Sequence, residues 1–151
     1  VLVLTRQGLP TLPNTIDKAY EGVSRGAYVV SDAQKEPEAI LLATGSEVSL
    51  AIEAQKALFD KNIDVRVVSI PSWDRFESQD ETYKNEVIPP HIKKRVAIEM
   101  ASSLGWERYA GDEGKIIAVD KFGASGQGDI VVKEYGFTVE NIVNHVEELF
   151  K

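Results

Sequence analysis

The chain has 151 residues, of which 43% are hydrophobic and 27% are charged, a composition typical of one folded domain with a sizeable core. Its 17 basic and 24 acidic residues give a formal net charge of −7, which disfavours a nucleic-acid or anionic-membrane surface, because those surfaces need clustered Lys and Arg. The absence of cysteine excludes disulfides and thiolate zinc sites, and no apolar run approaches the roughly 18 residues that span a bilayer.

The first part of the chain is predicted to belong to something larger. Residues 1–5 (VLVLT) read as a strand that begins at once, without an initial Met, so we expect a piece of a longer protein. Residues 6–26 read as a connecting arm because they carry prolines and glycines. Residues 1–26 are therefore predicted to be the tail of a preceding domain with its linker arm, and residues 27–151 a single α/β domain.

The next segments predict two strands and a βαβ unit. Residues 27–31 (AYVVS) and 39–43 (AILLA) are β-rich, and the short polar gap between them favours a hairpin. A helix is predicted over 46–61, with Ser46 as its cap and an apolar face at helical spacing. The strand predicted over 63–70 (IDVRVVSI) then completes a right-handed parallel βαβ unit.

The second half supplies the remaining elements. The pattern predicts a short helix within a long surface segment over 71–93, strands over 94–101 and 115–120, a helical turn near Trp106, a helix over 129–135 and a final helix capped by Thr138. About five strands with helices between the later ones predict a three-layer α/β/α fold. Its mixed sheet should be mostly parallel, with one antiparallel strand.

Two glycine-containing turns could bind an anion. The turn 43–48 (ATGSEV) leads from a strand into a helix, but Glu47 places a carboxylate where a phosphate would lie, so a structural cap is favoured. The loop 122–129 (FGASGQGD) has three glycines without the spacing of a nucleotide-binding loop. A tight structural turn is favoured there, although a close approach to a ligand or another domain stays open.

The histidines and tryptophans do not indicate a catalytic centre. His91 and His145 have no sequence neighbour that suggests a metal pair or a catalytic dyad, so both are expected to be solvated. Trp73 and Trp106 are expected to serve in packing or an interface. Arg6, where the first strand ends, is either a surface residue or an anion-binding group, because its planar guanidinium can hold a phosphate or carboxylate through two parallel hydrogen bonds.

Five collinear motifs resemble a known family, the C-terminal domain of transketolases. They are LTRQGLP (4–10), LLATGSEVSLA (41–51), VRVVSIPSWDRFESQD (65–80), FGAS (122–125) and EYGFTVENIV (134–143). The resemblance implies a transferase of the pentose phosphate pathway that moves a two-carbon ketol unit from a ketose phosphate to an aldose phosphate. It also implies a cytoplasmic homodimer that, at full length, uses thiamine diphosphate and a divalent metal, magnesium or calcium.

In that family the cofactor groups and catalytic residues belong to the two earlier domains. The resemblance therefore implies no catalytic, cofactor-binding or metal-binding residue in this chain, which should be inactive alone. Its expected partners are sugar phosphates, the other transketolase domains and a second subunit, with no nucleic acid and no membrane. Its expected roles are subunit assembly and substrate-phosphate binding.

One functional residue is carried over by the resemblance. The arginine of the family's Ser-Arg-Gln motif binds the sugar phosphate and aligns with Arg6. Gly8 stands where the family usually has asparagine, and Gly126-Gln127-Gly128 replaces its usual Ala-Pro. Two alternatives remain: the last domain of a related thiamine diphosphate enzyme (dihydroxyacetone synthase or deoxyxylulose-phosphate synthase), or a stand-alone ligand-sensing module that uses the turn 43–48 or the loop 122–129.

Overall fold

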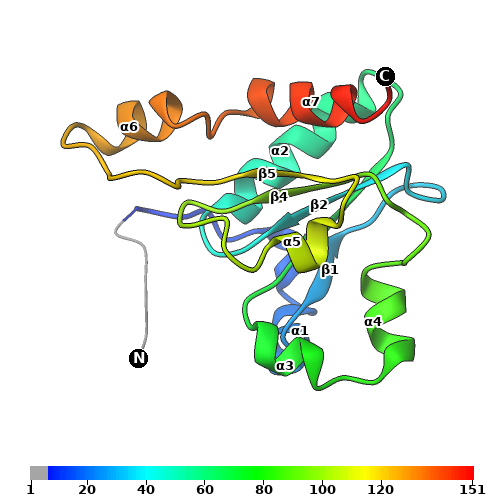
Figure 1. The fold of residues 1–151 in the computed structure, drawn as a ribbon. Coiled ribbons are helices and arrows are strands. Elements are labelled where there is room, and N and C mark those ends of the chain that lie inside the picture. The colour runs from blue at the N-terminus through cyan, green and yellow to red at the C-terminus, as the bar shows by residue number, and fades with distance from the viewer. Residues whose placement is uncertain (1–6) are drawn as a thin grey trace.

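The computed structural model describes residues 7–151, with the backbone alone at Asn14 (Figure 1). The predicted strand over residues 1–5, together with Arg6, lies outside the described residues. The elements are η1 (Pro13–Thr15), α1 (Ala19–Arg25), β1 (Tyr28–Ser31), β2 (Ala39–Ala43), α2 (Glu47–Phe59), β3 (Val65–Ser69), α3 (Trp73–Glu77), α4 (Glu81–Val87), β4 (Arg95–Ile98), α5 (Glu107–Ala110), β5 (Lys115–Ile117), α6 (Gly128–Glu134) and α7 (Val139–Glu148). Over residues 7–151, no helix combines the length and apolar character needed to cross a bilayer.

The sheet has five strands in the order β1-β3-β2-β4-β5, with β1 antiparallel to β3 and every other pair parallel (Figure 1). This confirms the mixed, mostly parallel sheet. The predicted hairpin between β1 and β2 is wrong, because both edges of β2 are paired with parallel neighbours. All residues of β2 are buried, which is typical of a central strand that is covered on both faces.

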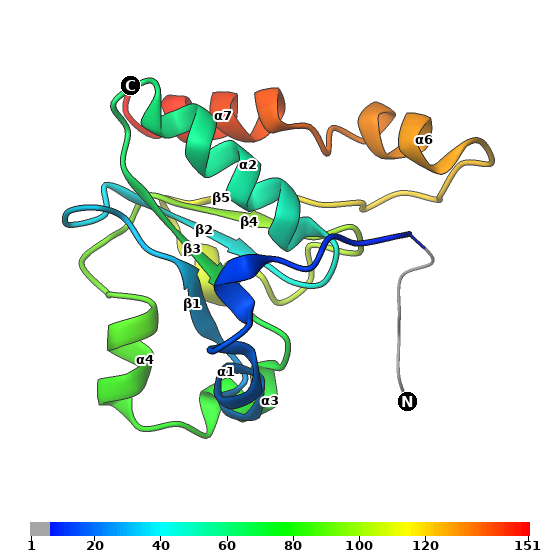
Figure 2. The same cartoon turned by 180° about the vertical axis from the view of Figure 1, so that it is seen from behind.

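Helices cover both faces of the sheet and confirm the three-layer arrangement. Successive strand side chains point to opposite faces, so Leu41 enters one core cluster while Ile40 and Leu42 enter the other. Helices α2 and α7 cover the first face, and α1, α3 and α4 lie on the other (Figures 1 and 2). The buried helical residues that form these contacts are Ala51, Leu58, Ile142, Val143 and Val146 on the first face, and Phe76, Val87, Tyr109 and Ala110 on the second.

The two predicted helix caps had different outcomes. The Thr138 hydroxyl accepts a 3.1 Å hydrogen bond from the backbone N–H of Asn141, which confirms the cap of α7. Ser46 lies at the predicted N-cap position of α2, but its side chain makes no cap bond. Its backbone already has helical angles (φ −66°, ψ −26°), whereas a capping residue is usually extended. Its hydroxyl donates instead to Glu47 Oε1 at 2.6 Å.

The arm predicted over residues 6–26 contains a helix, α1, that sequence reasoning missed. Gly22 lies inside this helix, and its lack of a side chain lets the ring of Tyr28 pack against it, because a Cβ at Gly22 would lie 2.2 Å from Tyr28 Cγ. Gly26 ends the helix in a left-handed conformation, with φ of 94°. One of the two glycines that looked like helix breakers therefore permits close packing within the helix.

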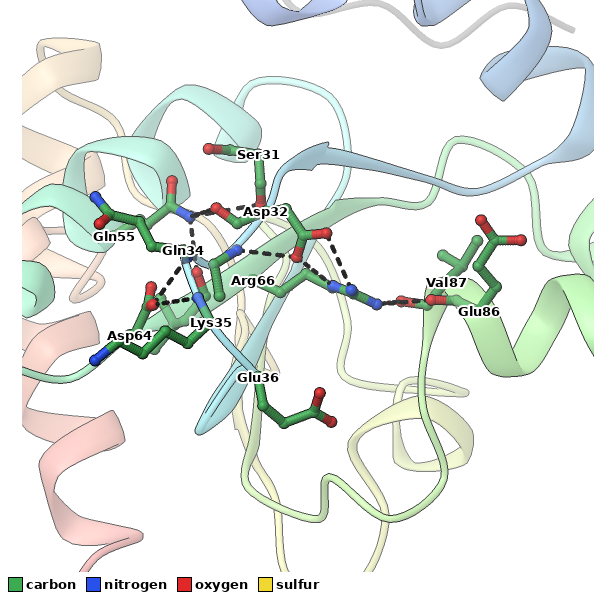
Figure 3. Close-up of polar contacts among 12 residues, drawn as sticks. Ser31, Asp32, Gln34, Lys35, Glu36, Gln55, Asp64, Arg66, Glu86 and Val87 are labelled. Atoms are coloured by element: carbon green, nitrogen blue, oxygen red, sulfur yellow. Dashed lines mark hydrogen bonds and ion pairs between the residues drawn. The ribbon is translucent and has the colours of Figure 1, made fainter.

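Polar contacts fix the loops at the edge of the sheet where the parallel strands begin, the amino edge (Figure 3). Arg66 of β3 donates through Nε and Nη2 to the two carboxylate oxygens of Asp32, at 2.7 and 3.1 Å. Its Nη1 donates to the backbone carbonyl of Glu86 in α4 at 2.6 Å. Asp64 accepts a 2.8 Å hydrogen bond from the backbone N–H of Gln34. Charged side chains at this edge therefore join the loops to the sheet and to α4.

Candidate functional site at the carboxyl edge of the sheet

The opposite edge, where the parallel strands end, is the carboxyl edge. The chain leaves β2 to form β3 on one side and then crosses to form β4 on the other side of β2. In open α/β sheets ligands bind outside the carboxyl ends of the strands at such a switch point. Helix α6 and the start of the dark blue segment that leads to η1 lie at the same side of the molecule as this edge, at the left in Figure 1 and at the right in Figure 2.

A pocket of about 350 Å³ opens at the carboxyl edge. The residues that line it come from the segments after β2, β3 and β4, and they are Thr44, Ile70, Pro71, Ser72, Trp73, Asp74, Glu99 and Trp106. Its polar groups are hydroxyls and carboxylates, and none of these lining residues is cationic. The pocket therefore provides acceptors for a neutral or cationic group and would repel the phosphate of a sugar ester.

Two buried or half-buried glutamates lie at this edge. Glu47 is 3% exposed and Glu99 is half-buried. Burial raises the pKa of Glu47 above its ordinary value, and the nearby charge of Glu99 raises it further, against the opposing effect of the Ser46 hydroxyl. Burial also raises the pKa of Glu99, and the hydrogen bond from Trp106 Nε1 at 3.2 Å opposes that rise. Both carboxyls are held closer to their neutral form than free glutamates are.

Aromatic rings form the wall beside these carboxylates. Trp73 and Trp106 meet edge to face, with ring centroids 5.5 Å apart, and Tyr109 lies 5.9 Å from Trp73. Gly105 has φ of 90°, and a Cβ there would lie 2.5 Å from Cζ3 of Trp73, so a glycine is needed for this packing. Tyr109 donates to Glu77 Oε1 at 2.8 Å, and burial raises its pKa. The predicted packing role of Trp106 is confirmed, since it is fully buried.

The loop after β5 forms the other part of the edge. Phe122 is 99% exposed, while its backbone carbonyl accepts a 2.6 Å hydrogen bond from the Tyr135 hydroxyl. The glycines of the loop do not have left-handed backbone angles, and Gly123 and Gly128 have open space where a Cβ would stand. The Tyr135 side chain therefore anchors the loop. The backbone angles of the loop do not require glycine at these positions.

The histidines predicted to be solvated differ in their surroundings. His91 is exposed, and its Nε2 lies 2.7 Å from Glu36 Oε1 at the molecular surface. His145 is half-buried on α7, and its Nδ1 lies 2.8 Å from the carbonyl oxygen of Asn141. They occupy different elements, and neither lines the pocket at the carboxyl edge. Arg6, the predicted phosphate-binding residue, lies outside the described residues.

The described part of the chain does not fit the metal that thiamine diphosphate requires. Within residues 7–151, no group of three or more His, Cys, Asp or Glu side chains could hold a metal ion. The acidic pocket is also a poor environment for a diphosphate, because Asp74 and Glu99 contribute negative charge to its wall. No step through a cofactor is therefore assigned to these residues.

Sequence reasoning missed the proximity of Glu47 and Glu99. A signal was present, because each glutamate follows a buried strand of the predicted parallel sheet, in GSEV and in VAIE. The carboxyl ends of parallel strands meet at the same edge, so both side chains could be expected at that edge of the sheet. What the pattern could not reveal was that β2 and β4 are direct neighbours.

Comparisons with known proteins agree with the fold. A family model described as "Transketolase-like TK C-terminal domain" matches residues 26–138. The chain is 60% identical over 149 residues to the transketolase of Geobacillus stearothermophilus and 58% identical over 149 residues to that of Bacillus subtilis (strain 168). Each match covers 98% of this chain and 22% of the relative, so the chain spans about a fifth of their length.

Solved structures extend the likeness to three dimensions. A Pichia stipitis transketolase in complex with sedoheptulose 7-phosphate superposes with a TM-score of 0.86 at 34% identity, over 95% of this chain and 20% of that chain. The transketolase of Leishmania mexicana gives a TM-score of 0.79 at 40% identity, over 85% of this chain and 18% of that chain. The sequence match over residues 26–138 and the shared fold lead to one conclusion: this chain belongs to the family of transketolase-like C-terminal domains.

Proposed function

We propose that the chain is the C-terminal part of a transketolase that transfers a two-carbon ketol unit from a ketose phosphate to an aldose phosphate. The single observation that carries this proposal is the 60% identity to a transketolase over 98% of the chain. Because the chain spans 22% of that relative, ketol transfer would need the remaining length. By itself the chain is inactive, and within the full-length enzyme it acts in subunit assembly and substrate binding.

The full-length enzyme in this proposal is a cytoplasmic homodimer of the pentose phosphate pathway. It uses thiamine diphosphate and magnesium or calcium, and the residues that hold them belong to the rest of the enzyme. The cofactor supplies the covalent chemistry of the transfer, while protein side chains bind and orient the sugar.

Arg6 is the proposed phosphate-binding residue of this chain. Its guanidinium would hold the phosphate of the sugar through two parallel charge-assisted hydrogen bonds. Two observations support this choice over the pocket at the carboxyl edge. The pocket is acidic, and the described segment ahead of η1, dark blue in the figures, begins on the carboxyl-edge side of the molecule (Figures 1 and 2). A phosphate held far from the reacting carbon provides binding energy that positions the reacting end.

The proposal is tested with steady-state kinetics of the full-length enzyme. Arg6→Ala should raise KM for a phosphorylated ketose by about 10- to 100-fold, the effect of losing hydrogen bonds to a charged group. It should leave KM for an unphosphorylated ketose within about twofold, because that substrate has no phosphate to lose. Arg108→Ala is the matched control, because the Arg108 side chain is 64% exposed on α5 and the resemblance gives it no phosphate-binding role.

The outcomes separate the site assignment from the enzyme class. Equal effects of Arg6→Ala on both kinds of substrate would reject Arg6 as the phosphate-binding residue. Transfer to formaldehyde, or condensation of pyruvate with an aldose phosphate, in place of ketol transfer between sugars would indicate one of the related thiamine diphosphate enzymes. Ketol transfer by the 151-residue chain alone would contradict the assignment of the chemistry to the rest of the enzyme.

A further inference from the structure

We propose that an apolar surface at the carboxyl edge is the docking site for the domain that precedes residue 1 in the full-length protein. This docking surface consists of Leu104, Phe122, Gly123, Ala124 and Ile130. The inference rests on the proposed function in one respect, namely that the chain is part of a longer transketolase. It goes further by naming the surface through which the parts of that protein associate.

The exposure of this surface is unusual for a folded domain. Leu104 is 79% exposed, Phe122 is 99% exposed and Ile130 is 53% exposed. Single exposed apolar side chains are common, but three from different segments at one edge of a sheet indicate an interaction site. A phenylalanine with almost all of its surface in water gains nothing from the core of its own domain.

The surface is held in place by polar contacts beneath it. Asp120 Oδ1 accepts hydrogen bonds from the backbone N–H of Ser103 at 2.9 Å and from the Ser102 hydroxyl at 3.1 Å. These bonds join the loop that carries Leu104 to the segment after β5, two residues before Phe122. The Tyr135 hydroxyl fixes the Phe122 carbonyl from the other side. The backbone at Phe122 is thus anchored on both sides while its ring faces solvent.

Helix α6 is poorly packed against the rest of the domain. None of its seven residues is buried, and a short helix with few buried contacts is marginal in water. A cavity of about 200 Å³ lies against it, with mostly apolar walls formed by Met100, Val119, Gly123, Ala124, Val131, Val132, Tyr135 and Phe137. Phe122 and Ile130 flank two of the segments that form this cavity. A partner with protruding apolar side chains would fill the cavity and cover both residues.

The place where the described chain begins indicates which partner covers the docking surface. The curated relatives are about five times as long as the part that this chain matches, since the match covers 22% of their length, and the matched family model is a C-terminal domain. The remaining length therefore precedes this region in those proteins. The dark blue segment that leads to η1 begins on the same side of the molecule as α6 (Figures 1 and 2). A domain attached ahead of residue 1 is thus tethered at high effective concentration on the side that carries the docking surface.

Hydrogen–deuterium exchange of two proteins, the 151-residue chain and the full-length protein, tests the proposal. Backbone amides of residues 121–131 should exchange at least about tenfold more slowly in the full-length protein, because docking suppresses local opening. Amides of residues 33–37, in the loop at the amino edge, serve as the internal control and should exchange equally in both proteins. Equal exchange of residues 121–131 in the two proteins would overturn the proposal.

A pair of matched variants tests the side chains themselves. Phe122→Gln in the full-length protein should lower the midpoint of thermal unfolding, and it should reduce the protection of residues 121–131. Phe59→Gln, the same change at the end of α2 on the amino edge where Phe59 is 46% exposed, should leave the protection of residues 121–131 unchanged. Loss of protection with Phe59→Gln but not with Phe122→Gln would contradict the assignment.

These readouts are independent of the enzymatic proposal. A full-length protein that transfers ketol units but shows no protection of residues 121–131 would overturn the docking site and leave the function standing. A full-length protein that shows the protection without ketol transfer would support the docking site and reject the function. Protection that appears in the 151-residue chain and grows with its concentration would identify a second copy as the occupant, and would overturn the choice of partner.

Discussion

The indole nitrogen of Trp106 donates a 3.2 Å hydrogen bond to Glu99 Oε2 and joins the start of α5 to the carboxylate that follows β4. Trp106 is fully buried and Glu99 is half-buried, so neither group can exchange this bond freely for one to water. The contact also connects the pocket at the carboxyl edge to the aromatic cluster behind it. Its removal should therefore lower the stability of the domain.

Trp106→Phe should destabilise the domain by about 2–4 kcal/mol, because it removes the donor and leaves a cavity behind the smaller ring. Urea unfolding followed by circular dichroism measures this loss. A double-mutant cycle with Glu99→Met isolates the bond, and the coupling energy should be about 1–2 kcal/mol. Strict additivity of the two changes would show that the hydrogen bond contributes nothing and that only packing was lost.

Glu47→Gln tests the protonation of the buried carboxyl. Burial raises the pKa of Glu47 in the folded domain above its value in the unfolded chain, so the folded state binds the proton more tightly. The free energy of unfolding of the wild-type domain should therefore fall as the pH rises from the ordinary glutamate pKa through the raised one. The amide of the variant does not titrate, and it retains an oxygen that can accept from the Ser46 hydroxyl.

The stability of Glu47→Gln relative to wild type should thus improve as the pH rises above the ordinary glutamate pKa of about 4.3, and it should level off above the raised pKa. Thermal unfolding at several pH values measures the difference. Glu99→Gln should change in the same direction, because burial also raises the pKa of Glu99. A difference between variant and wild type that is constant across this pH range would contradict a raised pKa at Glu47.

Arg66→Met tests the network at the amino edge that Figure 3 shows. The Arg66 side chain is only 13% exposed, and its loss would remove the hydrogen bonds that it donates to Asp32 and to the carbonyl of Glu86. We expect a loss of about 2–3 kcal/mol in the free energy of unfolding. Lys61→Met is the matched control, because it breaks an exposed ion pair with Glu147, which should cost no more than about 1 kcal/mol. Equal losses in the two variants would reject the special role of Arg66.

Gly26→Ala tests a close backbone approach at the end of α1. A Cβ at Gly26 would lie 2.3 Å from the backbone nitrogen of Phe76, and φ is 94°. We expect destabilisation by about 3 kcal/mol or more, from backbone strain together with the clash. Gly45→Ala separates the two effects, because φ there is 57° and the nearest atom to a Cβ would be Glu47 Oε2 at 3.9 Å, so strain alone should cost about 1–2 kcal/mol. Chemical denaturation of both variants measures the difference, and equal costs would exclude a contribution from the clash.

The secondary structure was largely available from local patterns in the sequence. The helix predicted over 46–61 and the strand predicted over 63–70 correspond to α2 (Glu47–Phe59) and β3 (Val65–Ser69), because their apolar residues recur with the period of each element. The cap at Thr138 could also be predicted, because it depends only on residues within one turn. The family was identified from five collinear motifs and confirmed by the match over residues 26–138.

Both mistaken predictions concern features that are decided by contacts between different segments of the chain. The hairpin between β1 and β2 was inferred from the length of their connection, but pairing was decided by β3 and β4, which occupy both edges of β2. Helix α1 was missed because a glycine that permits contact with the ring of Tyr28 looks the same in a sequence as one that breaks a helix. The phosphate-binding role of Arg6 came from the resemblance and stays a prediction.

The sequence by itself determined the fold class and the family, because hydrophobic periodicity and short motifs are properties of consecutive residues. Only the tertiary structure decided that Glu47 approaches Glu99, and that Leu104, Phe122 and Ile130 are left exposed at one edge of the sheet. Both features depend on which strands are neighbours and on how much surface the rest of the chain covers. These quantities arise from contacts between distant segments, and a local pattern does not contain them.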